Sequence, residues 1–314
     1  MARKKKKKRS QAPVALVYFI SLLLGLSLAG GVSYYLLEKY EVFKPSDNDS
    51  KQDKTRSTNI LFARVSDQGD FRDLAVFRID PFKKEILIVP QPAMTKTAAG
   101  KQYKEVMADS GVSGLQRAVG TALGINIDYY ATVTDSAFEQ VIDIMGSMSY
   151  KAPQELYHIS QESSRDDISI QKGDLVSLTS RQIRNLMDLD IFNNSRQGNL
   201  EFAGKALEDV VNNGFRQAAV LQDNLYNIYE IITAGSDTNI TKDVYNELRK
   251  YLNEMLEERD IPARTLLPEG YWNNDYTAFT MKSEFVSSVG REFGVKTQSG
   301  DSSVTTTPTE PPPT

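Results

Sequence analysis

The sequence predicts an α/β domain, a mixed sheet flanked by helices, that follows a single transmembrane helix. Two observations favour the domain. Short runs rich in β-forming residues recur along the chain, and segments of helical periodicity alternate with them in one stretch. A third observation favours the transmembrane helix: a basic block precedes twenty-four residues without a charge.

The N-terminal segment has the pattern of a membrane anchor. Residues 1–13 form a basic tail, and residues 14–37 carry no charge. A helix of that length measures roughly 36 Å, which exceeds the hydrocarbon core of about 30 Å. Since basic residues favour the cytoplasmic side, we expect the tail in the cytoplasm and the remaining chain outside the cell membrane. The protein is then a single-pass protein with an extracytoplasmic domain.

A cleaved signal peptide is the alternative for the same segment. Its apolar region would be shorter and would end at small residues, and Ser27, Ala29 and Gly30 would suit such a site. The run ends instead in Tyr34 and Tyr35, which are typical of a membrane interface. A pair of small residues within the run could also pack two such helices together, which would make a homo-oligomer through the anchor.

Composition excludes several classes of protein. The chain has no cysteine, so a domain outside the cell must depend on its core for stability. The formal net charge is −4, although the basic tail alone contributes seven positive charges. The rest of the chain is therefore acidic, and an acidic exterior argues against a nucleic-acid partner.

Polar segments mark the limits of one folded unit. Residues 38–58 have almost no apolar content after Phe43 and predict a flexible linker. Residues 297–314 are rich in Ser, Thr and Pro and predict a disordered tail. The extracytoplasmic domain is therefore expected at residues 59–296.

Within that domain we expect strands at residues 59–65, 74–79, 85–89 and 129–134, which are apolar and rich in β-forming residues. A turn sequence at residues 80–84 joins the second and third strands into a hairpin. Helical periodicity is present at residues 114–123, from Asp135 to Gly146, and at 180–188, 199–212, 216–232 and 242–258. Asp135 is expected to cap its helix.

The run from Gly124 to Gly146, GINIDYYATVTDSAFEQVIDIMG, resembles the LytR-CpsA-Psr (LCP) domain. Further matches to that family lie at residues 59–62, 73–77, 88–90, 196–197 and 225–241. The resemblance covers residues 59–267 in the family's order. It implies an α/β/α fold with a long apolar cavity for a polyprenyl chain.

The resemblance also implies a function. Members of the family move a glycopolymer from a polyprenyl-pyrophosphate carrier onto peptidoglycan, outside the membrane. Arginines would grip the pyrophosphate, and Mg²⁺ held by carboxylates would help the diphosphate leave. By position in the motifs, Asp73 is the expected catalytic and metal-binding carboxylate. Arg196 is the other expected catalytic residue, and it binds substrate together with Arg72 and Gln197.

Departures from the family's motifs predict an altered or inactive site. Arg64-Val65-Ser66 stands where the family has Gly-x-Asp, and Pro90-Gln91-Pro92 stands where it has Pro-Arg-Asp. The arginine of the Arg-Ser-Asp motif is displaced by one position, to Arg72, which in a strand turns it to the other face. Of a later arginine cluster, only Arg196-Gln197 is kept. Basic residues that could take over are Lys96, Lys101, Arg64 and Arg181.

Three functions therefore stay open. The first is a glycopolymer transferase acting on polyprenyl-pyrophosphate-linked donors. The second is a non-catalytic module that binds a polyprenyl lipid or a protein partner and regulates wall assembly, and the third is a structural partner in an envelope complex. Among the remaining residues, Asp143 and His158 are expected to have no chemical role. Trp272 is expected to be structural, with stacking on a sugar as its alternative.

Overall fold

The computed structural model describes residues 57–159, 164, 167–189, 196–258 and 261–295. The predicted elements outside these residues are the basic tail 1–13, the anchor 14–37, nearly all of the linker 38–58 and the tail 297–314. Among the helices of the described residues, none has the length and apolar content needed to cross a membrane.

A five-stranded sheet forms the centre of the domain, in the order β4-β1-β2-β3-β9. The strands are β1 (Thr58–Val65), β2 (Phe71–Asp80), β3 (Glu85–Pro92), β4 (Tyr129–Thr134) and β9 (Ala263–Thr265). The pairs β1/β2 and β2/β3 are antiparallel, whereas β4 and β9 join the edges as parallel strands. The predicted mixed sheet is therefore confirmed, including its hairpin. Asp80 holds the hairpin turn by accepting hydrogen bonds from the backbone N–H groups of Phe82 and Lys83.

The helices are α2 (Tyr103–Leu123), α3 (Asp135–Met145), α4 (Ser180–Met187), α5 (Arg196–Arg216), α6 (Ala218–Thr233), α7 (Lys242–Glu258) and α8 (Ser283–Glu292). Helix α2 begins earlier than predicted, because its polar first half hides the periodicity and Gly111 interrupts it with a φ of 62°. The expected cap of α3 was wrong. Thr134, not Asp135, caps this helix, since its side chain accepts from the backbone N–H of Ala137.

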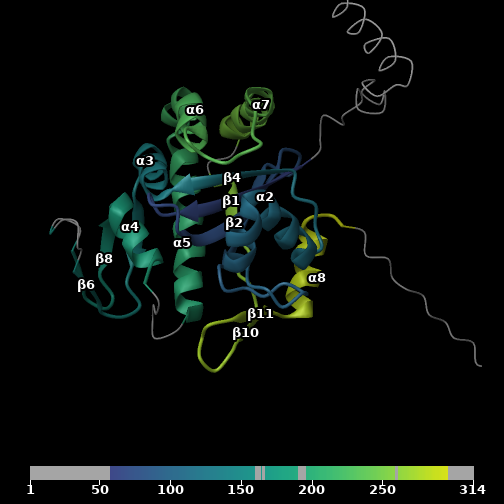
Figure 1. Cartoon of the computed structure of the whole chain (residues 1–314). Coiled ribbons are helices and arrows are strands. Elements are labelled where there is room, and N and C mark those ends of the chain that lie inside the picture. Colours follow the sequence, from purple (N-terminus) through teal and green to yellow (C-terminus); the bar gives the residue numbers. More distant parts are fainter. Residues whose placement is uncertain (1–56, 160–163, 165–166, 190–195, 259–260, 296–314) are drawn as a thin grey trace, which may run out of the picture. The chain divides into compact units, whose positions relative to one another are not determined.

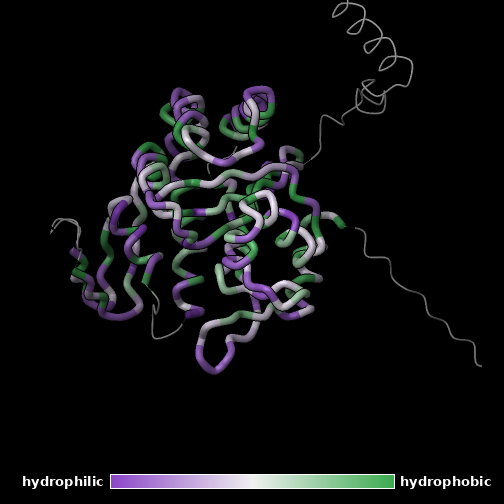
Figure 2. The backbone as a smooth tube through the Cα atoms, viewed as in Figure 1, coloured by the Kyte–Doolittle hydropathy of each residue, from purple (hydrophilic) through white to green (hydrophobic). Residues whose placement is uncertain are grey.

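Three short antiparallel pairs were not predicted. They are β5 (Met148–Lys151) with β8 (Leu175–Leu178), β6 (Leu156–His158) with β7 (Ile168–Ile170), and β10 (Gly270–Trp272) with β11 (Phe279–Met281). Each of these strands has only three or four residues, too few to establish an alternating pattern. In Figure 2 the tip of the β10–β11 hairpin is hydrophilic.

The two faces of the sheet are covered by different helices (Figure 1). Along β1, Ile60 and Phe62 lie against α3, α5, α6 and α7, whereas Leu61 and Ala63 lie against α2 and α8. This alternation follows from the two-residue period of a strand. Both faces are apolar, as expected for a sheet between two helical layers.

Candidate functional site

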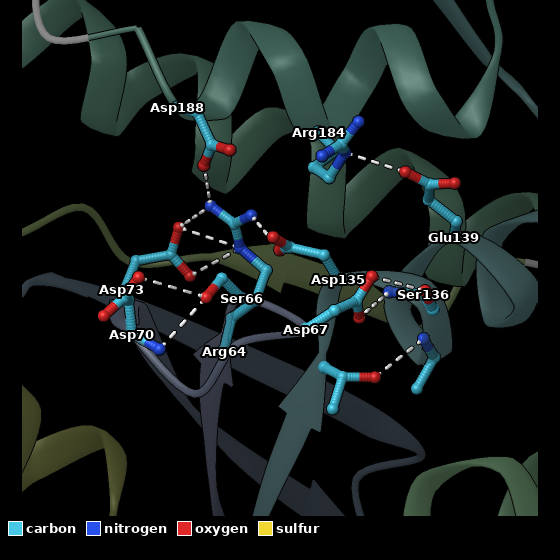
Figure 3. Close-up of polar contacts among 12 residues, drawn as sticks. Arg64, Ser66, Asp67, Asp70, Asp73, Asp135, Ser136, Glu139, Arg184 and Asp188 are labelled. Atoms are coloured by element: carbon cyan, nitrogen blue, oxygen red, sulfur yellow. Dashed lines mark hydrogen bonds and ion pairs between the residues drawn. The ribbon is translucent and has the colours of Figure 1, made fainter. Parts of the chain in front are cut away.

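A buried arginine lies at the end of the sheet where helices α3 and α4 approach it. Arg64 is near the end of β1, on the face that carries Ile60 and Phe62, and its side chain is only 5% exposed. Its guanidinium donates to three carboxylates, those of Asp73, Asp135 and Asp188 (Figure 3). The Nη1–Oδ1 distance to Asp135 is 2.7 Å, and the Nη2–Oδ2 distance to Asp73 is 2.6 Å.

Each carboxylate comes from a different element. Asp73 is on β2, directly opposite Arg64 in the strand register. Asp135 is the first residue of α3, where the helix dipole favours a negative charge. Asp188 is at the C-terminal end of α4, where the dipole disfavours a negative charge. The ion pair with Arg64 therefore offsets an unfavourable position of Asp188.

The electrostatics of this group, here called the Arg64 cluster, are unbalanced. It holds one formal positive charge and three negative charges. Burial alone would lower the pKa of Arg64, but Asp73 and Asp188 raise it above its ordinary value, so the guanidinium stays charged. Burial raises the pKa of Asp135, and the nearby charge of Arg64 opposes that shift. The cluster as a whole carries an excess of negative charge.

A polar cavity of about 250 Å³ opens beside the cluster. Arg64, Asp73 and Asp188 line it on one side. Arg196, from the first turn of α5, lines it on another, with its guanidinium carbon 5.6 Å from the ring centre of Trp272. Its other polar lining residues are Arg72, Gln91 and Asn199.

Two apolar cavities follow the polar one along the same face of the sheet. The inner cavity, about 170 Å³, shares Arg64, Asp73, Met187 and Leu207 with the polar cavity. The outer cavity, about 210 Å³, shares six lining residues with the inner one: Phe62, Phe77, Val141, Met145, Val211 and Ile232. The three cavities thus form a series that leads from helices α6 and α7 to the Arg64 cluster.

The structure brings together three of the four predicted site residues. Asp73, Arg196 and Arg72 all line the polar cavity, whereas Gln197 is not among its lining residues. Arg72 neighbours Asp73 on β2 and is exposed, yet it still lines the polar cavity. The stretch from residue 190 to 195, where most of the altered arginine cluster lies, is outside the described residues.

Other charged residues considered in the sequence have different surroundings. Of the four basic residues that could replace lost arginines, only Arg64 lines the polar cavity. Lys101 pairs with Asp109, and Arg181 lies near Glu139. Asp67, next to the altered Gly-x-Asp position, accepts from the N–H and hydroxyl groups of Ser136 at the start of α3.

Asp135 and Asp188 were missed as site residues. Asp135 looked like a helix cap, and Asp188 is at the end of a helix, where a polar residue is ordinary. One signal was present in β1. An arginine that continues the face of Ile60 and Phe62 in an apolar strand must be buried, and a buried charge requires partners.

The model of the LytR_cpsA_psr family matches residues 72–292. No curated protein matches the sequence. Among solved structures, a protein from Eubacterium siraeum has 14% identity and a TM-score of 0.66, over 80% of this chain and 97% of its own.

Two further structures have the same fold. TagV of B. subtilis has 18% identity and a TM-score of 0.59, over 76% of this chain and 96% of its own. TagT bound to LIIa-WTA has 13% identity and a TM-score of 0.57, over 76% of this chain and 90% of its own. At these identities the likeness establishes the fold, and the family match over most of the described domain establishes the ancestry. The chain belongs to the LytR-CpsA-Psr family.

Proposed function

We propose that this protein binds a polyprenyl-pyrophosphate-linked glycopolymer outside the cell membrane during cell-wall assembly. The series of cavities is the observation that carries the proposal. An apolar chain fits the outer and inner cavities, whose lining is almost entirely apolar, and the pyrophosphate fits the polar cavity at their end. Family membership and the likeness to TagT and TagV support a role related to cell-wall glycopolymer transfer.

Arg196 and Arg72 are the residues we propose for the pyrophosphate, because both line the polar cavity. A guanidinium donates two parallel hydrogen bonds to a phosphate, which fixes the group as well as attracting it. Trp272 beside Arg196 offers a flat apolar surface to a sugar ring of the attached polymer. Gln197, which does not line the cavity, would act only by orienting Arg196 at the start of α5.

Transfer of the polymer to peptidoglycan and simple retention of the lipid remain the two forms of this function. The Arg64 cluster favours retention. Its only guanidinium is engaged by three carboxylates, so it cannot bind a phosphate without releasing one of them.

The expected Mg²⁺ does not fit this arrangement. Both carboxylate oxygens of Asp73, the residue proposed as its ligand, accept hydrogen bonds from Arg64. Within the described residues, no group of three or more His, Cys, Asp or Glu side chains is arranged to hold a metal ion. The chemistry proposed for this chain therefore uses no step through a metal.

Lipid binding can be tested by titrating the full-length protein with farnesyl pyrophosphate, a short polyprenyl pyrophosphate. The chain has one tryptophan, and Trp272 lines the polar cavity, so its fluorescence reports occupation of the head-group site. We expect saturable binding that farnesol and inorganic pyrophosphate alone do not reproduce. Arg196→Ala should weaken it by roughly tenfold or more, the loss of one charge-assisted contact.

A matched pair of variants tests the apolar cavities. Val211 lines both of them, so Val211→Phe should fill the space and reduce binding of farnesyl pyrophosphate. Val220 lies on the exposed side of α6, and Val220→Phe should leave binding unchanged. Equal binding by wild type and Val211→Phe would contradict the proposal. Incubation with a polyprenyl-pyrophosphate-linked glycan and peptidoglycan fragments would separate the two forms. Transfer releases polyprenyl phosphate or polyprenyl pyrophosphate, according to which bond of the carrier breaks, whereas retention releases neither.

The location outside the membrane is part of the same proposal. Residues 14–37 would anchor the chain once, with residues 1–13 in the cytoplasm, and the anchor could also pair two copies. The chain has no cysteine, so a single one introduced at the exposed Lys172 can be labelled selectively. We expect a membrane-impermeant maleimide to label it in intact cells. Labelling only after lysis would contradict this location.

A further inference from the structure

The Arg64 guanidinium occupies the point on which three carboxylates converge. Asp73, Asp135 and Asp188 come from β2, α3 and α4, and they meet through Arg64 (Figure 3). Asp135 is 6% exposed at its side chain, and Asp73 and Asp188 are 29% and 26% exposed. Three negative charges at such short range are stable only with a cation among them.

Among the remaining neighbours of the cluster, the positive charge of Arg184 opposes the rise that burial causes in the pKa of Asp135, but its ion pair is with another carboxylate. Arg184, which is close in Figure 3, pairs with Glu139 through an Nε–Oε1 contact of 2.7 Å. The ring of Phe138 lies against Arg64, with the guanidinium carbon 5.6 Å from its centre, and covers the group with an apolar surface. Arg64 is therefore the cation that the three carboxylates share.

From this geometry we infer that Arg64 is a built-in counter-ion that takes the place of a divalent metal in this chain. A divalent ion needs oxygen ligands about 2.0–2.6 Å away, and both oxygens of Asp73 and one oxygen each of Asp135 and Asp188 bind the guanidinium instead. The wild-type cluster therefore binds no divalent ion. With Arg64 present, the three carboxylates are not arranged to hold a metal ion. We expect that removing the guanidinium lets their oxygens approach one another and form a site for Mn²⁺ or Mg²⁺.

A purely structural ion pair and a replacement for a metal predict different properties for the Arg64→Ala variant. If Arg64 only supported the fold, Arg64→Ala would lose stability and gain nothing. If Arg64 replaces a metal, Arg64→Ala would lose stability and recover part of it when a divalent ion is added, because ligands that bind only the folded state stabilise it. This readout uses no lipid, so it stands or fails independently of the proposed function.

The experiment uses the full-length protein, with free Mn²⁺ measured by electron paramagnetic resonance and the melting temperature measured with and without Mn²⁺ and Mg²⁺. We expect Arg64→Ala to bind Mn²⁺ at least about tenfold more tightly than wild type, as three carboxylates without a competing cation should. Its melting temperature should rise on adding the ion, while that of wild type stays constant. Arg64→Lys, which keeps a positive charge, should behave like wild type.

A second variant assigns the new site to the cluster. Adding Asp135→Asn to Arg64→Ala should abolish the gain in Mn²⁺ binding. A folded Arg64→Ala protein without tighter Mn²⁺ binding would overturn the inference. If Arg64→Ala does not fold in any buffer, wild type decides the question: equal Mn²⁺ binding by wild type and Asp135→Asn supports the inference, and a loss of binding in Asp135→Asn overturns it.

Discussion

The two faces of the sheet differ in how they are filled. Against α2 and α8 the core residues Leu115, Val119 and Val289 are fully buried. Against α3, α5, α6 and α7 the side chains are equally apolar, but they enclose cavities of about 170 and 210 Å³. Protein interiors rarely leave such space empty. One face therefore supports the fold, and the other is shaped for a ligand.

The helices over the hollow face are held by polar contacts as well as by packing. Asn212 of α5 makes two hydrogen bonds with the backbone of Ala263 on β9, of 3.0 and 2.9 Å. Asp67 holds the first turn of α3 through Ser136. Such contacts fix the ends of a helix without filling the space beneath it. This explains how the cavities can persist inside a stable domain.

The largest effect is expected from a pair of leucine variants. Leu115→Ala, on the packed face, should lower the free energy of unfolding by about 2–5 kcal/mol, because it leaves a void that its neighbours cannot fill. Leu225→Ala should cost roughly half as much, since Leu225 already borders a cavity and has fewer neighbours to lose.

Chemical denaturation followed by circular dichroism measures both values. Leu115 and Leu225 are both buried and both helical, so the pair is matched in burial and helix propensity. Equal losses would mean that the hollow face is packed in solution as tightly as the other. That result would remove the difference between the faces and would weaken the proposal of lipid binding.

The next largest effect is expected when the polar contacts of α5 are removed. Asn212→Leu keeps the size of the side chain but leaves the N–H and C=O groups of Ala263 unpaired in the interior. We expect a loss of about 2–3 kcal/mol in the free energy of unfolding. Asn224→Leu on α6 is the control, because Asn224 bonds only to Val220 of its own helix. If the two variants lose equally little, packing alone holds α5.

The sequence was sufficient for the sheet and insufficient for the site. Strands β1 to β4 were predicted because their apolar runs are long enough to show a pattern. The Arg64 cluster could not be predicted, because its members lie up to 124 residues apart and meet only in the folded chain. The family's motifs pointed to Asp73 and Arg196, and those are the positions where the chain departs least from the pattern.

A smaller effect is expected at Gln91, near the end of β3. Its side chain is 1% exposed, and neither polar atom of its amide has a hydrogen-bond partner among the described residues. Gln91→Leu should therefore raise the free energy of unfolding by about 1 kcal/mol. Because Gln91 lines the polar cavity, the same variant should weaken binding of farnesyl pyrophosphate.

Gln116→Leu is the matched control for Gln91→Leu. Gln116 donates to the backbone carbonyl of Ile127 at 2.7 Å, so its replacement should destabilise the protein. Chemical denaturation gives the sign of the change in the free energy of unfolding for each variant. Trp272 fluorescence gives the affinity for farnesyl pyrophosphate. A loss of stability in Gln91→Leu would show that its amide has a partner in solution, such as an ordered water.

The smallest effect is the pH dependence of the contact that holds α3. Hydrogen bonds from the hydroxyl and the N–H of Ser136 lower the pKa of Asp67 below its ordinary value. A carboxyl whose pKa is lower in the folded state stabilises that state above its unfolded pKa, near 3.9, and the contribution is lost as the pH falls through the folded pKa.

Asp67→Asn removes this titration but keeps an oxygen that can accept from Ser136. We expect the variant to be slightly less stable than wild type at neutral pH and to approach it below about pH 3. Asp143→Asn removes one charge from the exposed side of the same helix and controls for net charge. Melting temperatures across the acid range provide the measurement. A deficit of Asp67→Asn that stays constant with pH would mean that the carboxylate charge does not hold α3. The hollow face would then depend for its shape on Thr134 at this end of the helix.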